Sequence, residues 1–290
     1  MKYHVQTISP SNPHYPPLLR QIHDPPKTLY VRGNLDILTY DKLLAVVGSR
    51  KNSHYGRQVM EKILTPAVEA GLILVSGFAH GIDTLAHKIC LTQKQPTIAV
   101  LGSGLNDDAV YPSTNRSLIK EIITTGGALV SEYPPSTKAQ QYHFPQRNRV
   151  IAGLTPATLV IQARQKSGSL ITARLALESN RDVAAIPGPI TDPLSQGTNW
   201  LIQQGAHVIT KPADLLHLYD LEEPTTTPTN LSQLSLDQAN LLKHISADAQ
   251  HVDQLIEQAS LSAPQVSGLL LELELAGAIE NIGGMRYVRK

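Results

Sequence analysis

The sequence predicts an α/β protein: a mostly parallel sheet with helices on both faces, followed by a small C-terminal winged-helix domain. Short apolar runs such as Leu43–Val47 recur along the chain and alternate with amphipathic segments, as in buried parallel strands joined by crossover helices. Most of these runs end in turns rich in glycine and serine. Because ligands of such folds gather beyond the carboxyl ends of the strands, we expect the functional site at that edge of the sheet.

Length and composition limit what the protein can be. The chain has 290 residues, of which 41% are hydrophobic, and a formal net charge of +1, so a nucleic-acid site would have to be a local patch. The single cysteine excludes an intramolecular disulfide and a cysteine-based zinc cluster, and it suits a reducing compartment. Since there is no run of about 18 apolar residues and no signal-like start, we expect a cytoplasmic protein.

The N-terminal part divides into an arm and a main domain. Residues 1–40 are dense in proline, which favours an extended arm with a short helix at 18–22 and a strand at 29–32, packed on the main domain. The main domain is expected to span residues 41–221. Apolar runs predict its strands at 43–47, 72–75, 97–101, 128–130, 157–161, 182–186 and 207–209, and amphipathic patterns predict helices at 55–70, 83–91, 114–124 and 197–204, with another after residue 169.

The C-terminal part has a different composition. Residues 222–233 are rich in proline and threonine, which is typical of a linker. Residues 234–290 then predict three amphipathic helices, at 236–246, 252–259 and 264–275, and a hairpin around Gly283 and Gly284, which together are the elements of a winged helix. The third helix has no Arg or Lys and carries two glutamates, so we expect this domain to contact protein and not to read DNA bases.

Positive charge is concentrated at residues 133–177, which contain no Asp or Glu. The cations of this stretch are Lys138, Arg147, Arg149, Arg164, Lys166 and Arg174. The turn at residues 167–169 follows an expected strand and precedes a helix-like pattern, so its backbone N–H groups and the helix dipole would favour a phosphate. For any one arginine, the alternative is an ion pair with an acidic group elsewhere in the chain.

Other polar residues follow neighbouring strands. Arg50 and Lys51 come directly after the first strand of the main domain, and Ser76 and Gly77 follow the next one. We expect all four at the same edge as the 167–169 turn, as phosphate-type contacts.

Phe144 is one of two phenylalanines in the chain and stands beside the basic residues Arg147 and Arg149. We expect it on a loop, where it can stack on a nucleic-acid base with little sequence preference. A groove of phosphate donors with one aromatic platform suits a single strand.

Enzyme and cofactor motifs are incomplete. Asp83 and His87 would share a helix face, as an acid/base pair or two metal ligands, but no third ligand is evident. We interpret Asp83 as a helix-orienting residue and His87 as a partly buried one. Gly102 and Gly104 are half of a dinucleotide fingerprint whose third glycine and acidic residue are missing, so we expect no NAD, no metal and no other cofactor.

Eight motifs, in order, resemble the DprA/Smf family. They are GSRK at 48–51, SGFAHGIDTLAH at 76–87, VLGSGLNDDAVYP at 100–112, GGALVSEYP at 126–134, FPQRNRVIAGL at 144–154, SGSLITA at 167–173, IPGPI at 186–190 and QGTNWLIQQGA at 196–206. The resemblance implies an extended Rossmann-like fold, a pocket for single-stranded DNA at the sheet edge, and a homodimer. It further implies protection of incoming DNA and loading of RecA during natural transformation and recombination, without enzymatic activity or membrane association.

The resemblance and the charge pattern together give the expected site. The residues expected to contact DNA are Arg50, Lys51, Ser76, Gly77, Phe144, Arg147, Asn148, Arg149, Lys166, Ser167, Gly168 and Ser169. The expected dimer interface contains Trp200, Leu201 and Ile202. RecA is the expected partner protein, and a single-strand-binding protein is a further candidate.

Two features depart from the family pattern. Gln162 stands where the family usually has Glu before the SGSL turn, which would remove a negative charge from the pocket rim. Many members also carry a helical domain before the proline-rich arm, whereas this sequence begins at the arm.

Two other functional classes stay open as alternatives. The sheet and its glycine turns also resemble the Rossmann-type nucleotide hydrolases of the lysine-decarboxylase-like class, which need a PGG-x-GT-x-x-E turn whose Glu acts on the ribose. This chain has Ala173 and Arg174 where that acid would stand, and release of free base from nucleoside monophosphates would favour the enzyme. The second alternative, a winged-helix transcription regulator, is disfavoured by the acidic third helix.

Overall fold

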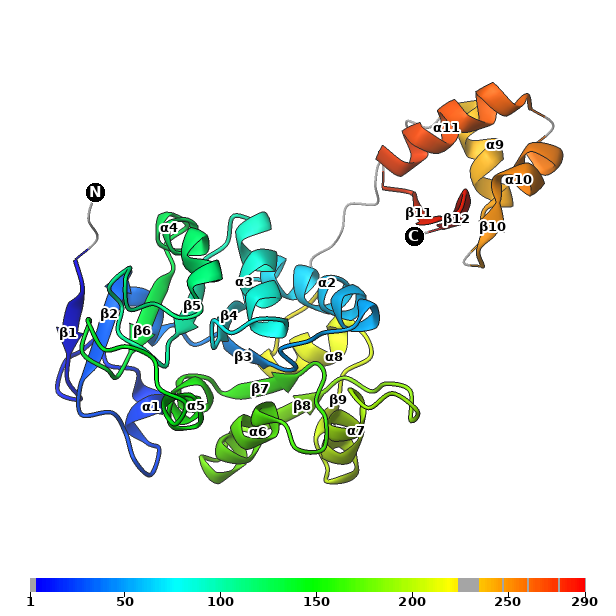
Figure 1. Cartoon of the computed structure of the whole chain (residues 1–290). Helices are drawn as coiled ribbons and strands as arrows, with labels where there is room; N and C mark the ends of the chain where they lie inside the picture. Colours follow the sequence, from blue (N-terminus) through cyan, green and yellow to red (C-terminus); the bar gives the residue numbers. More distant parts are fainter. Residues whose placement is uncertain (1–3, 224–234, 247, 260, 276, 290) are drawn as a thin grey trace. The chain divides into compact units, whose positions relative to one another are not determined.

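The computed structural model describes residues 4–223, 235–246, 248–259, 261–275 and 277–289 (Figure 1). The chain forms two compact units, Met1–Pro224 and Thr225–Lys290. Within the described residues, the first unit contains a nine-stranded sheet in the order β1-β2-β6-β5-β4-β3-β7-β8-β9, and the second a three-stranded sheet in the order β10-β12-β11. The predicted fold class, a mostly parallel sheet with helices on both faces and a C-terminal winged helix, is confirmed.

The parallel part of the large sheet is built outward from its central strand. Its strands are β3 (Leu43–Val47), β4 (Ile73–Ser76), β5 (Thr97–Val100), β6 (Ala128–Ser131), β7 (Ala157–Val160), β8 (Asp182–Ala185) and β9 (His207–Val208). The chain adds β4, β5 and β6 on one side of β3 and then returns to add β7, β8 and β9 on the other. The boundary between β3 and β7 is therefore the topological switch point, where open α/β sheets bind their ligands.

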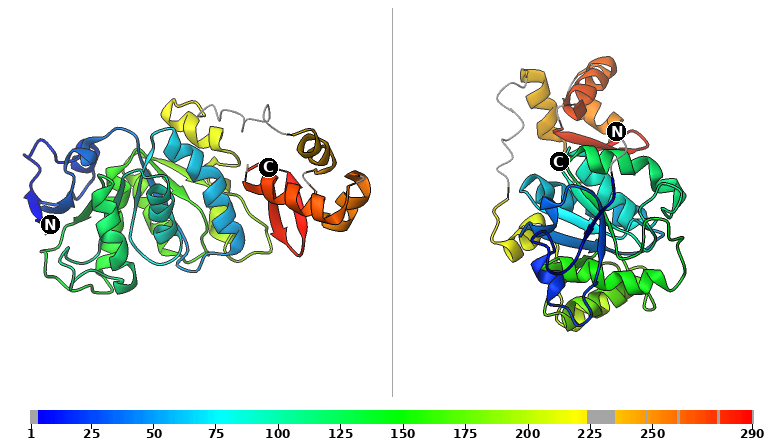
Figure 2. Two further views of the ribbon diagram at one scale, coloured as in Figure 1. Left: turned by 90° about the horizontal axis from the view of Figure 1, so that it is seen from above. Right: turned by 90° about the vertical axis from the view of Figure 1, so that its left-hand side faces the viewer.

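Helices cover both faces of this sheet (Figures 1 and 2). One face carries α2 (His54–Glu69), α3 (Ile82–Thr92), α4 (Arg116–Thr124) and α8 (Pro212–Leu216), and the other carries α5 (His143–Leu154), α6 (Gly168–Glu178) and α7 (Gln196–Gln203). The sequence of β3 is continuously apolar because the strand is buried on both faces. Leu44 and Val46 pack on the side of α2, and Ala45 and Val47 pack on the side of α5. No helix in the described part of the chain is long and apolar enough to span a membrane.

The proline-rich arm extends the sheet. It forms β1 (Gln6–Ile8), α1 (Pro17–Arg20) and β2 (Leu29–Gly33), and β2 pairs antiparallel with β6 while β1 pairs with β2. The short helix α1 packs on α5 at Gly153, where an added Cβ would lie 2.8 Å from Leu19 Cδ1. Strand β1 is not predicted from the sequence, because three residues beside prolines give no periodic pattern.

The largest error of the sequence prediction concerns Phe144. It lies in helix α5 and not on a loop. Pro145 makes this segment look non-helical in the sequence. It stands in the first turn of the helix, however, where backbone N–H groups form no intrahelical hydrogen bond, so a proline is tolerated there. Phe144, Arg147 and Asn148 therefore project from one rigid element. The remaining short elements of this unit are the 3₁₀ turns η1 (Asp36–Thr39), η2 (Ser113–Asn115) and η3 (His217–Tyr219).

The second unit has its own small core. It consists of α9 (Leu236–His244), β10 (Gln250–His251), α10 (Val252–Ala259), α11 (Ala263–Leu275), β11 (Ile279–Gly283) and β12 (Arg286–Arg289). Leu241, Leu255, Val266 and Ile279 are buried together between its helices and strands. The three helices and the hairpin agree with the prediction, and β10, which was not predicted, pairs with β12. Most of the expected linker lies outside the described residues.

Candidate nucleic-acid interface

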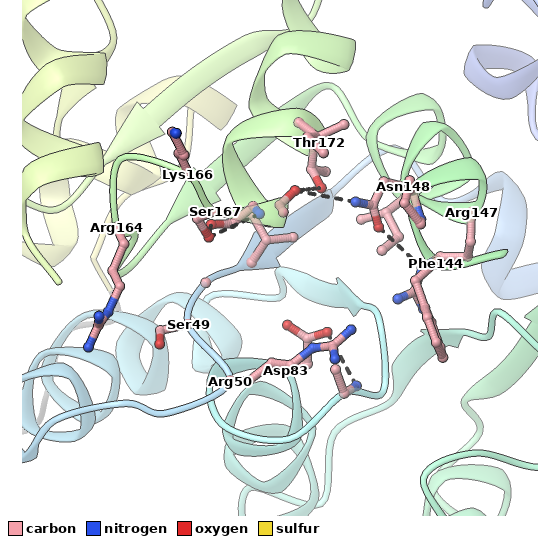
Figure 3. Close-up of a pocket in the computed structure, with 18 of the residues that line it drawn as sticks. Ser49, Arg50, Asp83, Phe144, Arg147, Asn148, Arg164, Lys166, Ser167 and Thr172 are labelled. Atoms are coloured by element: carbon pink, nitrogen blue, oxygen red, sulfur yellow. Dashed lines mark hydrogen bonds between the residues drawn. The ribbon is translucent and has the colours of Figure 1, made fainter. Parts of the chain in front are cut away.

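A pocket of about 570 Å³ opens beyond the carboxyl ends of β3, β4 and β7, at the switch point of the sheet (Figure 3). Loops from these strands meet the first turns of α5 and α6 there. Its polar and aromatic lining residues are Ser49, Arg50, Asp83, Tyr111, Gln141, Phe144, Arg147, Asn148, Arg164, Lys166, Ser167, Ser169 and Thr172.

The loop that carries Arg50 is fixed against the start of α3. The backbone N–H of Ile82 donates to the carbonyl oxygen of Ser49 at 3.2 Å. Gly81 makes this approach possible, since its φ is +77° and an added Cβ would lie 2.3 Å from the same oxygen. The backbone is therefore rigid up to Arg50, whose side chain is exposed in the pocket.

Two aromatic rings and a guanidinium form a platform on one wall. The guanidinium carbon of Arg50 lies 5.4 Å from the centroid of the Phe144 ring, and the Tyr111 ring lies 5.7 Å from it at 45°. Phe144 packs over Gly102, where an added Cβ would lie 3.0 Å from its Cδ1. Tyr111 is half exposed and was not predicted as a site residue, although the scarcity of aromatic residues in this chain made it a usable signal.

Two buried groups of opposite charge, Arg147 and Asp83, lie close together beneath the pocket. Arg147 is 4% exposed and donates from Nη1 to the carbonyl oxygens of Gly77 and Val100. Burial lowers the pKa of Arg147 to about 10, and the nearby Asp83 carboxylate opposes that shift. Burial raises the pKa of Asp83, while Arg147 and the N–H of Ala79 act to lower it. Asp83, which the sequence assigned a purely structural role, therefore also lines the pocket.

The first turn of α6 forms the opposite wall. Ser167 is its N-cap, and its Oγ accepts from the N–H of Ser169 at 3.3 Å. Asn148 reaches across from α5 and donates from Nδ2 to the carbonyl oxygen of Gly168 at 3.3 Å. No atom of the described residues outside the helix's own backbone lies within 4 Å of a Cβ built on Gly168, so this helix start faces open space. A helix N-terminus in this setting favours an anion.

The charge of the lining is strongly unbalanced. Arg50, Arg164 and Lys166 are exposed and have no ion pair among the described residues. Asp83 is the one carboxylate among the described lining residues, and it is largely buried. The pocket therefore presents net positive charge to an entering ligand.

The structure brings together most of the residues expected to contact DNA. Those that line the pocket are Arg50, Phe144, Arg147, Asn148, Lys166, Ser167, Gly168 and Ser169. The lining excludes Lys51, Ser76, Gly77 and Arg149. Ser76 is fully buried and its Oγ donates to the carbonyl oxygen of Val46, so it supports the strand ends instead.

Arg149 is committed elsewhere. Its guanidinium pairs with Glu132 at 2.6 Å and with Asp24 at 3.2 Å. Other cations of the acid-free stretch are also paired, Lys138 with Asp108 at 3.0 Å and Arg174 with Glu178 at 3.4 Å. These side chains therefore form ion pairs with acidic groups elsewhere in the chain, which is the alternative considered above for single arginines.

Gln162 does not lie at the pocket rim, contrary to expectation. It is 1% exposed, its Oε1 accepts from the N–H of Ser53 at 3.0 Å, and its Nε2 donates to Ser53 Oγ at 2.8 Å. Its carbonyl oxygen also accepts from the N–H of Ser49 at 2.8 Å. Gln162 therefore fastens both ends of the loop that carries Arg50.

The three expected dimer residues do not share one surface. Leu201 is 4% exposed and belongs to the main core, so it contributes little surface. Trp200 and Ile202 are two positions apart, which is about 200° around a helix. Trp200 is half exposed and faces α6, while Ile202 is half buried.

His87 is fully buried, more deeply than expected. Thr97 Oγ1 donates to the carbonyl oxygen of Leu74 and therefore accepts from Nδ1 of His87, at 2.8 Å. Nε2 is buried and has no hydrogen-bond partner among the described residues, and burial lowers the pKa of His87 to about 3. The described residues contain no group of three His, Cys, Asp or Glu side chains placed to hold a metal ion.

Two family models match the chain. Residues 6–220 match the model of the DNA recombination-mediator protein A, and residues 224–285 match that of the DprA winged helix domain. The chain is 41% identical over 283 residues to the Smf protein of Escherichia coli, covering 95% of this chain and 75% of that protein. It is 46% identical over 202 residues to DNA processing protein DprA of Streptococcus pneumoniae, covering 70% of each.

Solved structures give the same result. DprA from Streptococcus pneumoniae superposes with a TM-score of 0.68 and 43% identity, over 76% of this chain and 75% of that one. DNA processing protein A from Helicobacter pylori, described as having a unique single-stranded DNA binding mode, superposes with a TM-score of 0.66 and 30% identity, over 77% of this chain and 100% of that one.

The burial of His87 predicts a pH dependence of stability. Because the unfolded chain takes up a proton near the ordinary pKa of 6.5 and the folded chain only near 3, the free energy of unfolding should fall as pH falls through this window. The slope from this residue is at most about 1.4 kcal/mol per pH unit. In denaturant titrations at several pH values, His87→Gln should lose that part of the slope, and the exposed His80→Gln should not. Equal slopes for wild type and His87→Gln would contradict the assignment.

Proposed function

The chain belongs to the DNA recombination-mediator protein A family, also named DprA/Smf, and from this membership we propose that it binds single-stranded DNA in the switch-point pocket. One observation carries the proposal: exposed cations without ion pairs among the described residues line the same pocket as an aromatic platform. In this proposal Arg50, Arg164 and Lys166 contact phosphates, together with the N–H groups at the start of α6. A base stacks on Phe144 and Tyr111.

The aromatic platform favours single strands over duplex DNA. Phe144 is half buried within the pocket, so a base can reach it only when that base is free of its pairing partner. Stacking on an aromatic ring is worth about 1–3 kcal/mol per base and is tolerant of sequence. The described binding mode of the Helicobacter pylori relative supports the same ligand.

We infer the cellular role from the resemblance to the family. We propose that the protein protects incoming DNA in the cytoplasm and helps to load RecA onto it during natural transformation and recombination. RecA is the proposed partner protein, with a single-strand-binding protein as a further candidate. The name of the Streptococcus pneumoniae relative, DNA processing protein DprA, supports the DNA-processing part of this role.

A nucleotide hydrolase is the less supported alternative. Such an enzyme needs a carboxylate that reaches the ribose, and Asp83 is the one carboxylate among the described lining residues. Its Oδ2 already accepts from the N–H of Ala79, and Arg147 lies beside it beneath the pocket. We therefore propose a binding protein and not an enzyme.

The phosphate contact of Arg50 can be tested by charge reversal. Arg50→Glu should weaken binding of a labelled oligothymidine by about tenfold or more. It should also lower the slope of log K against log salt by about 0.7 for each phosphate that the variant no longer neutralises. Lys51→Glu, the matched control, makes the same charge change one residue later and outside the pocket lining, so its effect should be smaller. Gel shifts over a salt series measure both, and equal effects of the two substitutions would mean that only long-range charge matters.

We also propose a homodimer, formed through the edge where α7 and β9 end. Strand β9 is the last strand of the sheet, Val208 is 44% exposed, and Ile202 is half buried on the neighbouring helix. Ile202→Glu should give a monomer by light scattering while the circular dichroism spectrum stays unchanged. Trp200→Glu, on the other side of α7, is the control and should stay dimeric. Dimers from both variants would exclude this edge. If the dimer forms there, it carries two pockets, which raises the avidity for DNA.

The winged helix is proposed to contact protein and not to hold the DNA. Its third helix, α11, contains no Arg or Lys and carries Glu272 and Glu274, which would face phosphates if it entered a groove. A chain ending at Glu223 should therefore keep its affinity for oligothymidine within about threefold, roughly 0.65 kcal/mol. Titrations of both chains at fixed salt, with the dimer state checked in parallel, measure this. A decrease of tenfold or more in a truncated chain that remains dimeric would show that the tail binds DNA directly.

A further inference from the structure

A second hollow, of about 740 Å³, adjoins the switch-point pocket between α6 and α7. The two share the turn of residues 166–168 and Ile171, so they are continuous at the surface. We refer to this hollow as the α6–α7 groove. Its lining residues are Gln165, Lys166, Ser167, Gly168, Leu170, Ile171, Arg174, Leu177, Gly197, Trp200, Leu201 and Gln204.

The floor of the groove is apolar and unusually exposed. Trp200 is 49% exposed and Leu177 is 57% exposed, from different helices but on the same groove. Ile171, at the junction with the pocket, is 36% exposed. Large apolar side chains that gather on one open surface mark a binding site more often than chance.

The charged side chains among the described lining residues of the groove, Lys166 and Arg174, are both positive. Lys166 has no ion pair among the described residues, and Figure 3 shows it beyond Ser167, on the side away from Phe144. Arg174 pairs with Glu178 at 3.4 Å, its one ion pair within the described part of the chain. Both side chains are well exposed, so this pair is weak and Arg174 can turn to a phosphate. None of the described lining residues is acidic.

We propose that the DNA strand bound in the pocket continues across the turn of residues 166–168 into the α6–α7 groove. There, further bases stack on Trp200 and lie over Leu177, and their phosphates face Lys166 and Arg174. This inference rests on the proposed function, and it adds a second aromatic platform to the same binding path. An aromatic floor with cations and no carboxylate is the combination that sequence-tolerant single-strand binding uses.

A second copy of the chain is the other occupant that an apolar groove would suit. The charge of the groove favours DNA, because a self-complementary interface would bring Lys166 and Arg174 close to like charges. The continuity with the anion-binding pocket favours DNA as well. Self-association through this groove would therefore overturn the proposal.

Trp200 is the one tryptophan of the chain and reports on this groove directly. Its fluorescence should be followed while the protein is titrated with oligothymidines of about four and about twelve nucleotides, with binding measured independently by anisotropy of labelled DNA. The longer strand should quench Trp200, and the shorter one should bind with little quenching. The absence of binding by either strand would refute the proposed function itself. Binding of the longer strand without quenching would refute only the groove.

Substitutions give a second readout. Trp200→Ala should weaken binding of the longer strand by about tenfold and leave the shorter strand unaffected, and Trp200→Phe should restore most of the affinity, since it keeps a stacking ring. Ile190→Ala is the matched control, because Ile190 is 89% exposed but lines neither hollow. Equal weakening for both strand lengths would overturn the proposal. Trp200 emission that depends on protein concentration and not on DNA would assign the groove to a second copy.

Discussion

The pocket depends on one buried guanidinium. Arg147 donates to the carbonyl oxygens of Gly77, just beyond β4, and of Val100, the last residue of β5. It also lies close to Asp83. Gly77 leaves room for this, because an added Cβ there would lie 2.6 Å from Oδ2 of Asp83 and 2.7 Å from Nη2 of Arg147. A charge buried this deeply is tolerable only when it is paired and hydrogen-bonded. Helix α5 is thereby tied to the sheet, and with it Phe144, which carries the platform.

The fold was largely readable from the sequence because its strands are buried on both faces. Such strands appear as continuous apolar runs ending in glycine turns, and every parallel strand was predicted. Elements without a periodic signal were missed: β1 and β10 have three and two residues, and α8 has five. Helix α5 was not predicted at all, because its first turn faces a pocket, so its polar residues and Pro145 do not form an amphipathic pattern.

The site was predicted less completely, because the positions of charged residues along the sequence do not show which of them lie close together in the folded chain. Residues 133–177 contain no Asp or Glu. Arg149 nevertheless forms ion pairs with Glu132, just before this stretch, and with Asp24 of the arm. Arg174 pairs with Glu178, just after it. Arg164 and Lys166 find no such partner in the described structure, because they follow β7 at the one edge where the lining has a single carboxylate. The order of the strands in the sheet decides which cations come together at the pocket. The sequence shows the cations but does not show this order.

Gln162 shows how one uncharged side chain shapes this edge. Ser53 Oγ accepts from the N–H of Gly56 and from Nε2 of Gln162, while Oε1 of Gln162 accepts from the N–H of Ser53. An added Cβ on Gly56 would lie 2.2 Å from that Oε1, so the amide fits only beside glycine. A carboxylate in this buried position would carry a desolvation cost and would place negative charge behind the Arg50 loop. The amide both accepts from the N–H of Ser53 and donates to its Oγ, whereas a carboxylate could only accept. Because it is uncharged, it holds the loop without weakening the positive field of the pocket.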